Sequence, residues 1–310
     1  MKLLVINNKC SGLGDSDIYD FIRIATQEGD DVVIRNLSPK RSIAEMLVDA
    51  RDFDCVVAAG GDGTVASVCY ELRYTDVPIL IFPAGTANLL AMNLDSSNNP
   101  RELARLVREG QTARFDICEI EYVDVDGVQR KHGFGVIAGA GYDSKIMESA
   151  NRLKKSIGSL AYYLSFLTNS PDKLDIELII DGVEHRTEGM AALLVNFARV
   201  APDISIIHEN DAQDGLFDIV VLKPDKVWKL APTAISALLD AGGQFPERGD
   251  AIDIFSGREV YVRTEPPVRI QFDGEVLEAT TPFVARVLPR SFRAIVSDEE
   301  AEHLKSIGRL

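Results

Sequence analysis

The sequence predicts an α/β domain followed by a larger antiparallel β domain. In the first third of the chain, continuous apolar segments alternate with amphipathic ones, which is typical of parallel strands covered by helices on both faces. After about Gly110, segments of alternating polarity follow one another and are joined by Asp-Gly and Pro-Pro turns, which indicates antiparallel pairing. The length of 310 residues suits two domains.

The α/β domain is expected over residues 1–112, joined by the C-terminal segment 288–310. Its predicted strands are the apolar runs 2–7, 31–37, 54–60 and 78–85. Its predicted helices are 16–29, closed by Gly29, then 41–51, 65–74, 88–94, 100–110 and the terminal 298–308.

The β domain is expected over residues 113–287. Its predicted strands lie within 114–139, 173–196, 215–223, 259–264, 267–279 and 283–289. Two helical inserts, 158–169 and 226–243, interrupt this pattern.

Composition and charge exclude several classes of protein. A net charge of −15 disfavours a nucleic-acid partner, because binding nucleic-acid phosphates requires a basic face. No apolar stretch reaches 18 residues, so no transmembrane helix is expected, and the first residues indicate a strand rather than a signal peptide. The cysteines show no metal-ligand spacing and are interpreted as reduced, buried thiols of a cytoplasmic protein: Cys10, Cys55, Cys69 and Cys118.

The segment Gly-Gly-Asp-Gly-Thr, from Gly60 to Thr64, connects a predicted strand to a predicted helix. Glycines let the backbone approach a ligand closely, and the amides that begin a helix favour an anion. The segment is therefore a candidate phosphate loop. A carboxylate repels phosphate, so Asp62 is expected to face a metal ion or a hydroxyl. The residues alone leave open a plain turn in which Asp62 caps the helix.

Two more polar, glycine-bearing loops follow predicted strands of the same domain. Residues 82–91 run through Pro-Ala-Gly-Thr into a helix, with Thr86 as a natural cap and Asn88 in the first turn. Residues 7–14 follow the first strand. If the three strands are neighbours, their loops line one site that suits a nucleoside triphosphate.

Five motifs, NKCSG, AAGGDGT, PAGTANLLA, DGLFD and FDGE, occur along the chain. With these motifs at these distances, the sequence resembles the diacylglycerol kinase-like lipid kinases, which include bacterial soluble diacylglycerol kinases and sphingosine kinases. The resemblance covers roughly residues 2–296. GGDGT alone is shared with NAD kinases and, more loosely, with phosphofructokinases, whereas the combination is much more specific.

The resemblance implies an N-terminal domain like that of phosphofructokinase and NAD kinase, and a C-terminal β-sandwich. It also implies ATP- and Mg²⁺-dependent phosphorylation of a lipid hydroxyl. Diacylglycerol, phosphatidylglycerol, a sphingoid base and other lipid alcohols all stay open as the acceptor. The implied nucleotide-binding residues are Asn8, Ser11, Gly12, Gly60, Gly61, Asp62, Gly63, Thr64, Val65, Ala66, Thr86 and Asn88.

The resemblance also implies roles for carboxylates. Glu275, in FDGE, matches the catalytic base, although the residues alone favour a solvated strand residue after a hairpin turn. Asp62 and Asp116 match a metal- and water-linked network near the transferred phosphate. A structural magnesium site that includes main-chain oxygens is implied at Asp211, Asp214 and Leu216, where a plain hairpin turn is the alternative.

The sequence departs from the family pattern in several places. Leu89 stands where many relatives have an aspartate of the carboxylate network, although sphingosine kinases also lack it. Lys9 replaces a usual proline, Ala66-Ser67 replaces a common Asn-Glu, and residues 199–211 replace a glycine-rich stretch. Two alternatives stay open: a nucleotide- or lipid-binding protein that has lost turnover, and an NAD kinase, although the Asn-Glu pair usual in NAD kinases is not found.

Residues 151–167 carry Arg152, Lys154 and Lys155 ahead of an aromatic, apolar helical pattern. This arrangement suits the surface of an anionic membrane, and a core helix with a solvated basic end is the alternative. The expected protein is cytoplasmic and transiently at the membrane surface, with a lipid substrate and no nucleic-acid partner. A homodimer stays open.

Overall fold

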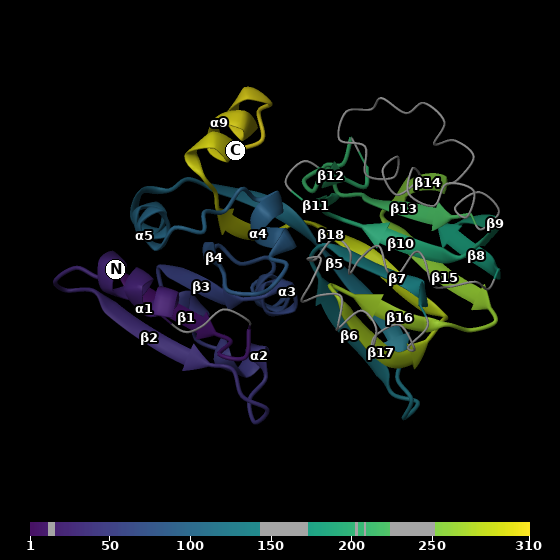
Figure 1. Cartoon of the computed structure of the whole chain (residues 1–310), viewed down its shortest axis with the longest axis horizontal. Helices are drawn as coiled ribbons and strands as arrows, with labels where there is room; N and C mark the ends of the chain where they lie inside the picture. The colour runs from purple at the N-terminus through teal and green to yellow at the C-terminus, as the bar shows by residue number, and fades with distance from the viewer. Residues whose placement is uncertain (12–15, 143–172, 202–203, 208, 224–251) are drawn as a thin grey trace. The chain divides into compact units, whose positions relative to one another are not determined.

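The computed structural model describes residues 1–11, 16–142, 173–201, 204–207, 209–223 and 252–310 (Figure 1). The chain divides into two compact units. The first comprises Met1–Ile117 and Leu288–Leu310, and the second comprises Cys118–Val287. Each unit is a separate fold with its own core.

A parallel sheet with the strand order β2-β1-β3-β4 forms the centre of the first unit. The C-terminal part of β18 (Phe283–Ile295) pairs with β4 in parallel, where Ala294 faces Ile79. The other strands are β1 (Lys2–Asn7), β2 (Asp31–Asn36), β3 (Cys55–Gly60) and β4 (Ile79–Pro83). The predicted α/β fold with a mostly parallel sheet is confirmed.

The helices of the first unit are short, and some of them are strongly amphipathic. The helices are α1 (Ser16–Ala25), α2 (Ile43–Met46), α3 (Asp62–Glu71), α4 (Leu89–Asn93), α5 (Pro100–Glu109) and α9 (Asp298–Ser306). Phe21 of α1 and Leu103 of α5 are fully buried in one cluster with the strand residues Val5 and Val57. Helix α5 begins with Asn99 as its N-cap and a proline in its first turn, two residue types that favour a helix start.

Two antiparallel sheets form the second unit. One has the order β14-β13-β10-β7-β16-β17. Its strands are β7 (Ile137–Tyr142), β10 (Ala191–Val195), β13 (Phe217–Leu222), β14 (Ile252–Gly257), β16 (Arg269–Phe272) and β17 (Glu275–Thr280). The other sheet contains the N-terminal part of β18 together with β15 (Glu259–Glu265), β8 (Leu174–Ile180), β9 (Val183–Gly189), β5 (Thr112–Val123) and β6 (Gln129–Phe134).

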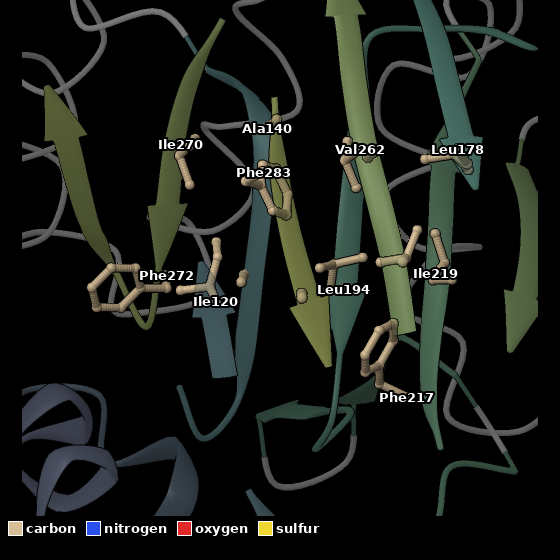
Figure 2. Packing of buried hydrophobic residues seen from close by; sticks show 14 of the residues in the cluster. Ile120, Ala140, Leu178, Leu194, Phe217, Ile219, Val262, Ile270, Phe272 and Phe283 are labelled. Carbon is tan, nitrogen blue, oxygen red and sulfur yellow. The ribbon is translucent and has the colours of Figure 1, made fainter. Parts of the chain in front are cut away.

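The inner faces of the two sheets pack into one hydrophobic core. Figure 2 shows Ile120 and Phe283 from one sheet and Leu194, Ile270 and Phe272 from the other within the same cluster. Alternate residues of several strands, such as β8 and β13, enter this core, as expected for face-to-face packing of antiparallel sheets. The predicted antiparallel β domain is confirmed.

Several local predictions need correction. The helix expected over 41–51 is only α2 followed by a 3₁₀ turn, Ala50–Asp52, and α3 begins at Asp62 rather than Val65. The strand β14 and the short strands β11 (Arg199–Ala201) and β12 (Ile204–Ser205) were not predicted. Cys10 is exposed, whereas the other three thiols are buried as predicted.

The predicted helices 158–169 and 226–243, and the basic residues Arg152, Lys154 and Lys155, lie outside the described residues. Within the described part of the chain, no helix combines the length and apolar character needed to cross a membrane.

A two-residue turn connects β16 to β17. Phe272 pairs with Glu275, and the intervening Asp273 and Gly274 have φ values of 43° and 83°. Positive φ at both turn residues fits the right-handed strand twist and explains the Asp-Gly sequence. The buried Asp273 carboxylate accepts hydrogen bonds from the N–H groups of Gly135, Val136 and Ile137, at 2.7, 2.8 and 3.2 Å. These bonds attach the turn to the segment between β6 and β7.

Thiol reactivity tests the placement of the cysteines. Cys10 is expected to react with a thiol reagent in the native protein, and the other three cysteines only after unfolding. Burial raises the pKa of Cys55 to about 12, so its reactive thiolate is absent at neutral pH. Absorbance of the released chromophore measures the number of thiols that react in the native protein. Cys10→Ser is the control and should abolish this reaction. Rapid reaction of two thiols would contradict this placement.

Asp273→Ala is expected to lower the free energy of unfolding by about 3 kcal/mol, because three buried N–H groups lose a charged acceptor. Urea unfolding measures the loss. Asp181→Ala is the matched control: Asp181 begins another Asp-Gly turn with φ of 48°, and its exposed carboxylate accepts hydrogen bonds from Arg258 and Glu259. The expected loss at Asp181 is about 1 kcal/mol. If both substitutions lowered the free energy of unfolding equally, burial of the Asp273 carboxylate would not explain its larger expected effect.

Candidate functional site

Three loops converge at the carboxyl ends of β1, β3 and β4, which are adjacent parallel strands. The loops comprise residues 8–11, 60–64 and 84–88. Adjacent parallel strands end at the same edge of a sheet, which is where ligands bind in this class of fold. The neighbouring strands that the sequence analysis required are therefore present.

Asn8 links the first loop to the second. Its main-chain N–H donates to the carbonyl of Ala59 at 2.9 Å, and its Nδ2 donates to Thr64 Oγ1 at 2.9 Å. Ser11 closes the first loop by donating its hydroxyl to the carbonyl of Asn8 at 2.6 Å. The hydroxyl of Thr64 is thus oriented by Asn8 and keeps its own proton for a ligand.

Glycine is required where the second and third loops meet. A Cβ on Gly85 would lie 2.4 Å from Gly61 Cα, and a Cβ on Gly60 would lie 2.7 Å from Thr64 Cβ. Ala84 N–H also donates to the carbonyl of Gly60 at 3.1 Å. The main chains of both loops are therefore packed against each other without side chains between them.

Asn88 shapes the third loop. Its side chain accepts a hydrogen bond from Gly85 N–H at 2.7 Å and returns one from Nδ2 to the carbonyl of Gly85 at 3.0 Å. Asn88 has φ of 51°, a left-handed conformation that asparagine tolerates better than most residues. The asparagine predicted to contact the nucleotide is thus also the residue that folds this loop.

Asp62 is buried, with 8% of its surface exposed, and it begins helix α3. Its Oδ1 accepts a hydrogen bond from Leu90 N–H at 2.8 Å, at the start of α4. Burial raises the pKa of Asp62, and hydrogen bonds from the main chain of Leu90 and Leu89 oppose that shift. The carboxylate therefore connects α3 to the first turn of the next helix, α4, and the N-cap of α3 is Gly61 rather than Asp62.

The first turn of α3 is available to a ligand. Gly61 is its N-cap and makes no side-chain cap hydrogen bond. N–H groups at the start of a helix have no intrahelical acceptor and carry a partial positive charge, so they favour a phosphate. The donor set at this end of the sheet therefore fits the phosphates of a nucleotide.

Asp116 belongs to the same unit and is completely buried on β5. Its Oδ1 accepts a hydrogen bond from Arg290 N–H at 2.6 Å. Arg290 has φ of 45°, so the chain bends where β18 meets this carboxylate. Asp116 therefore connects β5 to β18 within the first unit.

The remaining nucleotide-binding residues differ in exposure. Val65 and Ala66 are buried in the core, so only their main chain is available to a ligand. Thr86 is exposed at the third loop. Gly12 lies outside the described residues.

Glu275 is the exposed first residue of β17 and belongs to the second unit. The Asp-Gly turn before it is held by Asp273, whose importance the sequence analysis missed. The signal available in the sequence was the FDGE motif, in which an Asp-Gly turn directly precedes the candidate base. The sequence could not show that the aspartate is buried against the β6–β7 segment.

The candidate structural metal site lies on the turn before β13. Gln213 N–H donates to Asp211 Oδ1 at 3.0 Å, and Leu216 N–H donates to Asp214 Oδ1 at 2.8 Å. Burial, and then repulsion from Asp218, raise the pKa of Asp214. Carboxylate and carbonyl oxygens are ligands that Mg²⁺ prefers, so the donor types fit.

No three acidic, histidine or cysteine side chains in the described ranges are grouped to hold a metal ion. A Mg²⁺ ion at this turn would therefore need main-chain oxygens, such as that of Leu216, to complete its ligands.

Both halves of the chain match known family models. Residues 2–120 match the diacylglycerol kinase catalytic domain. Residues 135–296, more than half of the chain, match the YegS C-terminal NAD kinase beta sandwich-like domain.

Several curated relatives carry kinase names. A diacylglycerol kinase of Mycobacterium tuberculosis is 32% identical over 191 residues, which cover 59% of this chain and 60% of that protein. A diacylglycerol kinase of Bacillus subtilis is 27% identical over 269 residues, which cover 82% of this chain and 81% of that protein. The chain spans 55% to 60% of the length of the Synechocystis and mycobacterial relatives.

Solved structures share the fold. A diacylglycerol kinase from Bacillus anthracis superposes with a TM-score of 0.72 at 22% identity and covers 96% of this chain and 98% of that one. An NAD kinase from Archaeoglobus fulgidus in complex with ATP superposes with a TM-score of 0.54 at 14% identity and covers 99% and 98% of the two chains. These structures show the shared fold, and the two matched family models show that the chain belongs to the diacylglycerol kinase-like lipid kinase family.

Proposed function

We propose that this protein is an ATP- and Mg²⁺-dependent lipid kinase that phosphorylates the hydroxyl of diacylglycerol or a related lipid alcohol. The observation that carries the proposal is the convergence of three loops at adjacent strand ends, with Asn8 bonded to Thr64 and Gly85 packed on Gly61. Helix amides, a hydroxyl and close main-chain approach are the features that bind phosphates. The family of the chain supports ATP as the phosphoryl donor.

In the proposed reaction, the lipid hydroxyl loses its proton to the Glu275 carboxylate while its oxygen attacks the γ-phosphorus of ATP. The bond between that phosphorus and the bridging oxygen breaks, and ADP leaves. Phosphoryl transfer depends mainly on positioning and on neutralising charge. Mg²⁺ bound with ATP would neutralise negative charge on the phosphates, and Asp62 and Asp116 are the residues that would hold it, directly or through water.

The departure at Leu89 is compatible with this proposal. Where many relatives have an acidic side chain, the main chain of Leu89 and Leu90 donates to Asp62 instead. Asp62 therefore keeps a fixed orientation although position 89 carries no carboxylate. Contact with an anionic membrane through Arg152, Lys154 and Lys155 belongs to the same proposal and is supported by their sequence pattern.

The direct test incubates the purified chain with a bacterial lipid extract and γ-labelled ATP, with and without EDTA, and separates the products by chromatography. A labelled lipid that disappears with EDTA is the expected result. A parallel reaction with NAD distinguishes the NAD kinase alternative. If neither lipid nor NAD is labelled, the chain is not the kinase proposed here.

Asp62→Asn is expected to lower kcat at least about 100-fold, because the buried negative charge near the phosphates is lost. The amide oxygen can still accept the N–H of Leu90, so the melting temperature should change by only about 3 °C. Initial rates with the identified lipid and a thermal melt measure both effects. Asp54→Asn is the control. It removes a carboxylate at the other end of β3 that accepts a hydrogen bond from Lys2 N–H, and it should leave kcat unchanged. Full activity of Asp62→Asn would contradict the assignment.

Glu275→Gln is expected to lower kcat by about 100-fold or more, because an amide cannot accept the proton of the lipid hydroxyl. Affinity for ATP should stay the same, since Glu275 lies in the second unit. Steady-state kinetics and a fluorescent-nucleotide titration separate the two effects. Glu278→Gln changes another exposed glutamate of β17 and serves as the control. An active Glu275→Gln enzyme would remove Glu275 as the base.

A further inference from the structure

His132, on β6, shares the inner face of the sandwich with Glu275. It pairs with Ile120, a core residue of β5, and side chains of directly paired residues lie on the same face. On β17, Glu275 alternates with Leu277 and Ala279, which pack in or against the same core. Both β6 and β17 are edge strands of their sheets. Both ionisable side chains therefore lie on inner faces at edge strands, and the charge of Glu275 acts on His132.

Aromatic stacking holds His132 beside the hairpin that carries Glu275. The imidazole is stacked between Tyr122 and Phe272, with ring centroids 5.9 and 5.4 Å apart. Phe272 is the direct cross-strand partner of Glu275, and such pairs have Cβ atoms about 5 Å apart. The carboxylate of Asp273 also binds Gly135 N–H at 2.7 Å, just beyond the end of β6. The Phe272 stack and the Asp273 hydrogen bond thus hold β6 against the hairpin that carries Glu275.

The charges around His132 come from few groups. Partial desolvation between the aromatic rings lowers the pKa of His132, and the charge of Glu275 opposes this shift. Arg130 on the same strand and Asp124 on the preceding turn also act on it, in opposite directions. At neutral pH the imidazole is therefore largely uncharged, and a ring nitrogen is available to accept a proton.

We propose that His132 takes up the proton that Glu275 removes from the lipid hydroxyl and then releases it to solvent. The inference rests on the proposed function, because Glu275 must be the base. After transfer, the proton leaves the Glu275 carboxyl group for an imidazole nitrogen, and Glu275 becomes ionised again. Imidazole is ordinarily a stronger base than carboxylate, which makes it a suitable acceptor for this proton. The exposed His132 then gives the proton to water.

The first test measures kcat against pH for His132→Phe, which keeps an aromatic ring in the stack. The expected result is a fall in kcat of about tenfold at pH 8, with KM for ATP and the melting temperature unchanged. In the wild-type protein, kcat should decline at low pH as His132 gains a proton. This decline should disappear from the pH profile of His132→Phe. Added imidazole should restore activity to His132→Ala. His185→Phe is the control, since His185 packs on Phe255 in the same unit with a centroid distance of 4.8 Å.

The second test does not depend on turnover. Nuclear magnetic resonance resolves the titration of the four histidines, and Glu275→Gln should lower the pKa of His132 because an opposing charge is removed. An unchanged His132 titration would overturn the inference even if the protein is a lipid kinase. A His132→Phe enzyme with the original kcat and pH profile would overturn it as well. If Glu275→Gln lowers the pKa of His132 but the protein phosphorylates no lipid, the proposed function is wrong instead.

Discussion

The contact between Gly61 and Gly85 is the constraint on which the candidate nucleotide site depends. With 2.4 Å between a Cβ built on Gly85 and the Cα of Gly61, the two loops touch through bare main chain. Any side chain there would separate the ends of β3 and β4, and would move the first turn of α3 away from the third loop. The parallel register of β1, β3 and β4 creates this proximity, and glycine makes it sterically allowed.

Asp62 adds hydrogen bonds to the packing contact between the second and third loops. Its buried carboxylate would be costly without partners, and the main chain at the start of α4 supplies them. The same contact ties α3 to α4, so the second and third loops are joined by both packing and hydrogen bonds. The carboxylate is thus a structural part of the phosphate loops as well as the proposed neighbour of the metal ion.

The second unit repeats the use of a buried aspartate. Asp273 satisfies three consecutive main-chain N–H groups and so holds the turn that precedes Glu275. Phe272, on the other side of the turn, contributes to the core and stacks on His132. A flexible turn would place an exposed carboxylate poorly, whereas a turn anchored at both ends presents it in one position.

Sequence periodicity alone determined the fold class, because strongly apolar parallel strands and alternating antiparallel strands leave different patterns. It also located the three loops and the FDGE turn, since glycine and Asp-Gly have few other uses at strand ends. Only the tertiary structure decided that Asp62 bonds to α4, that Asp273 is buried, and that His132 lies beside the hairpin. These contacts join residues 28 to 140 positions apart, and a local pattern carries no information about such partners.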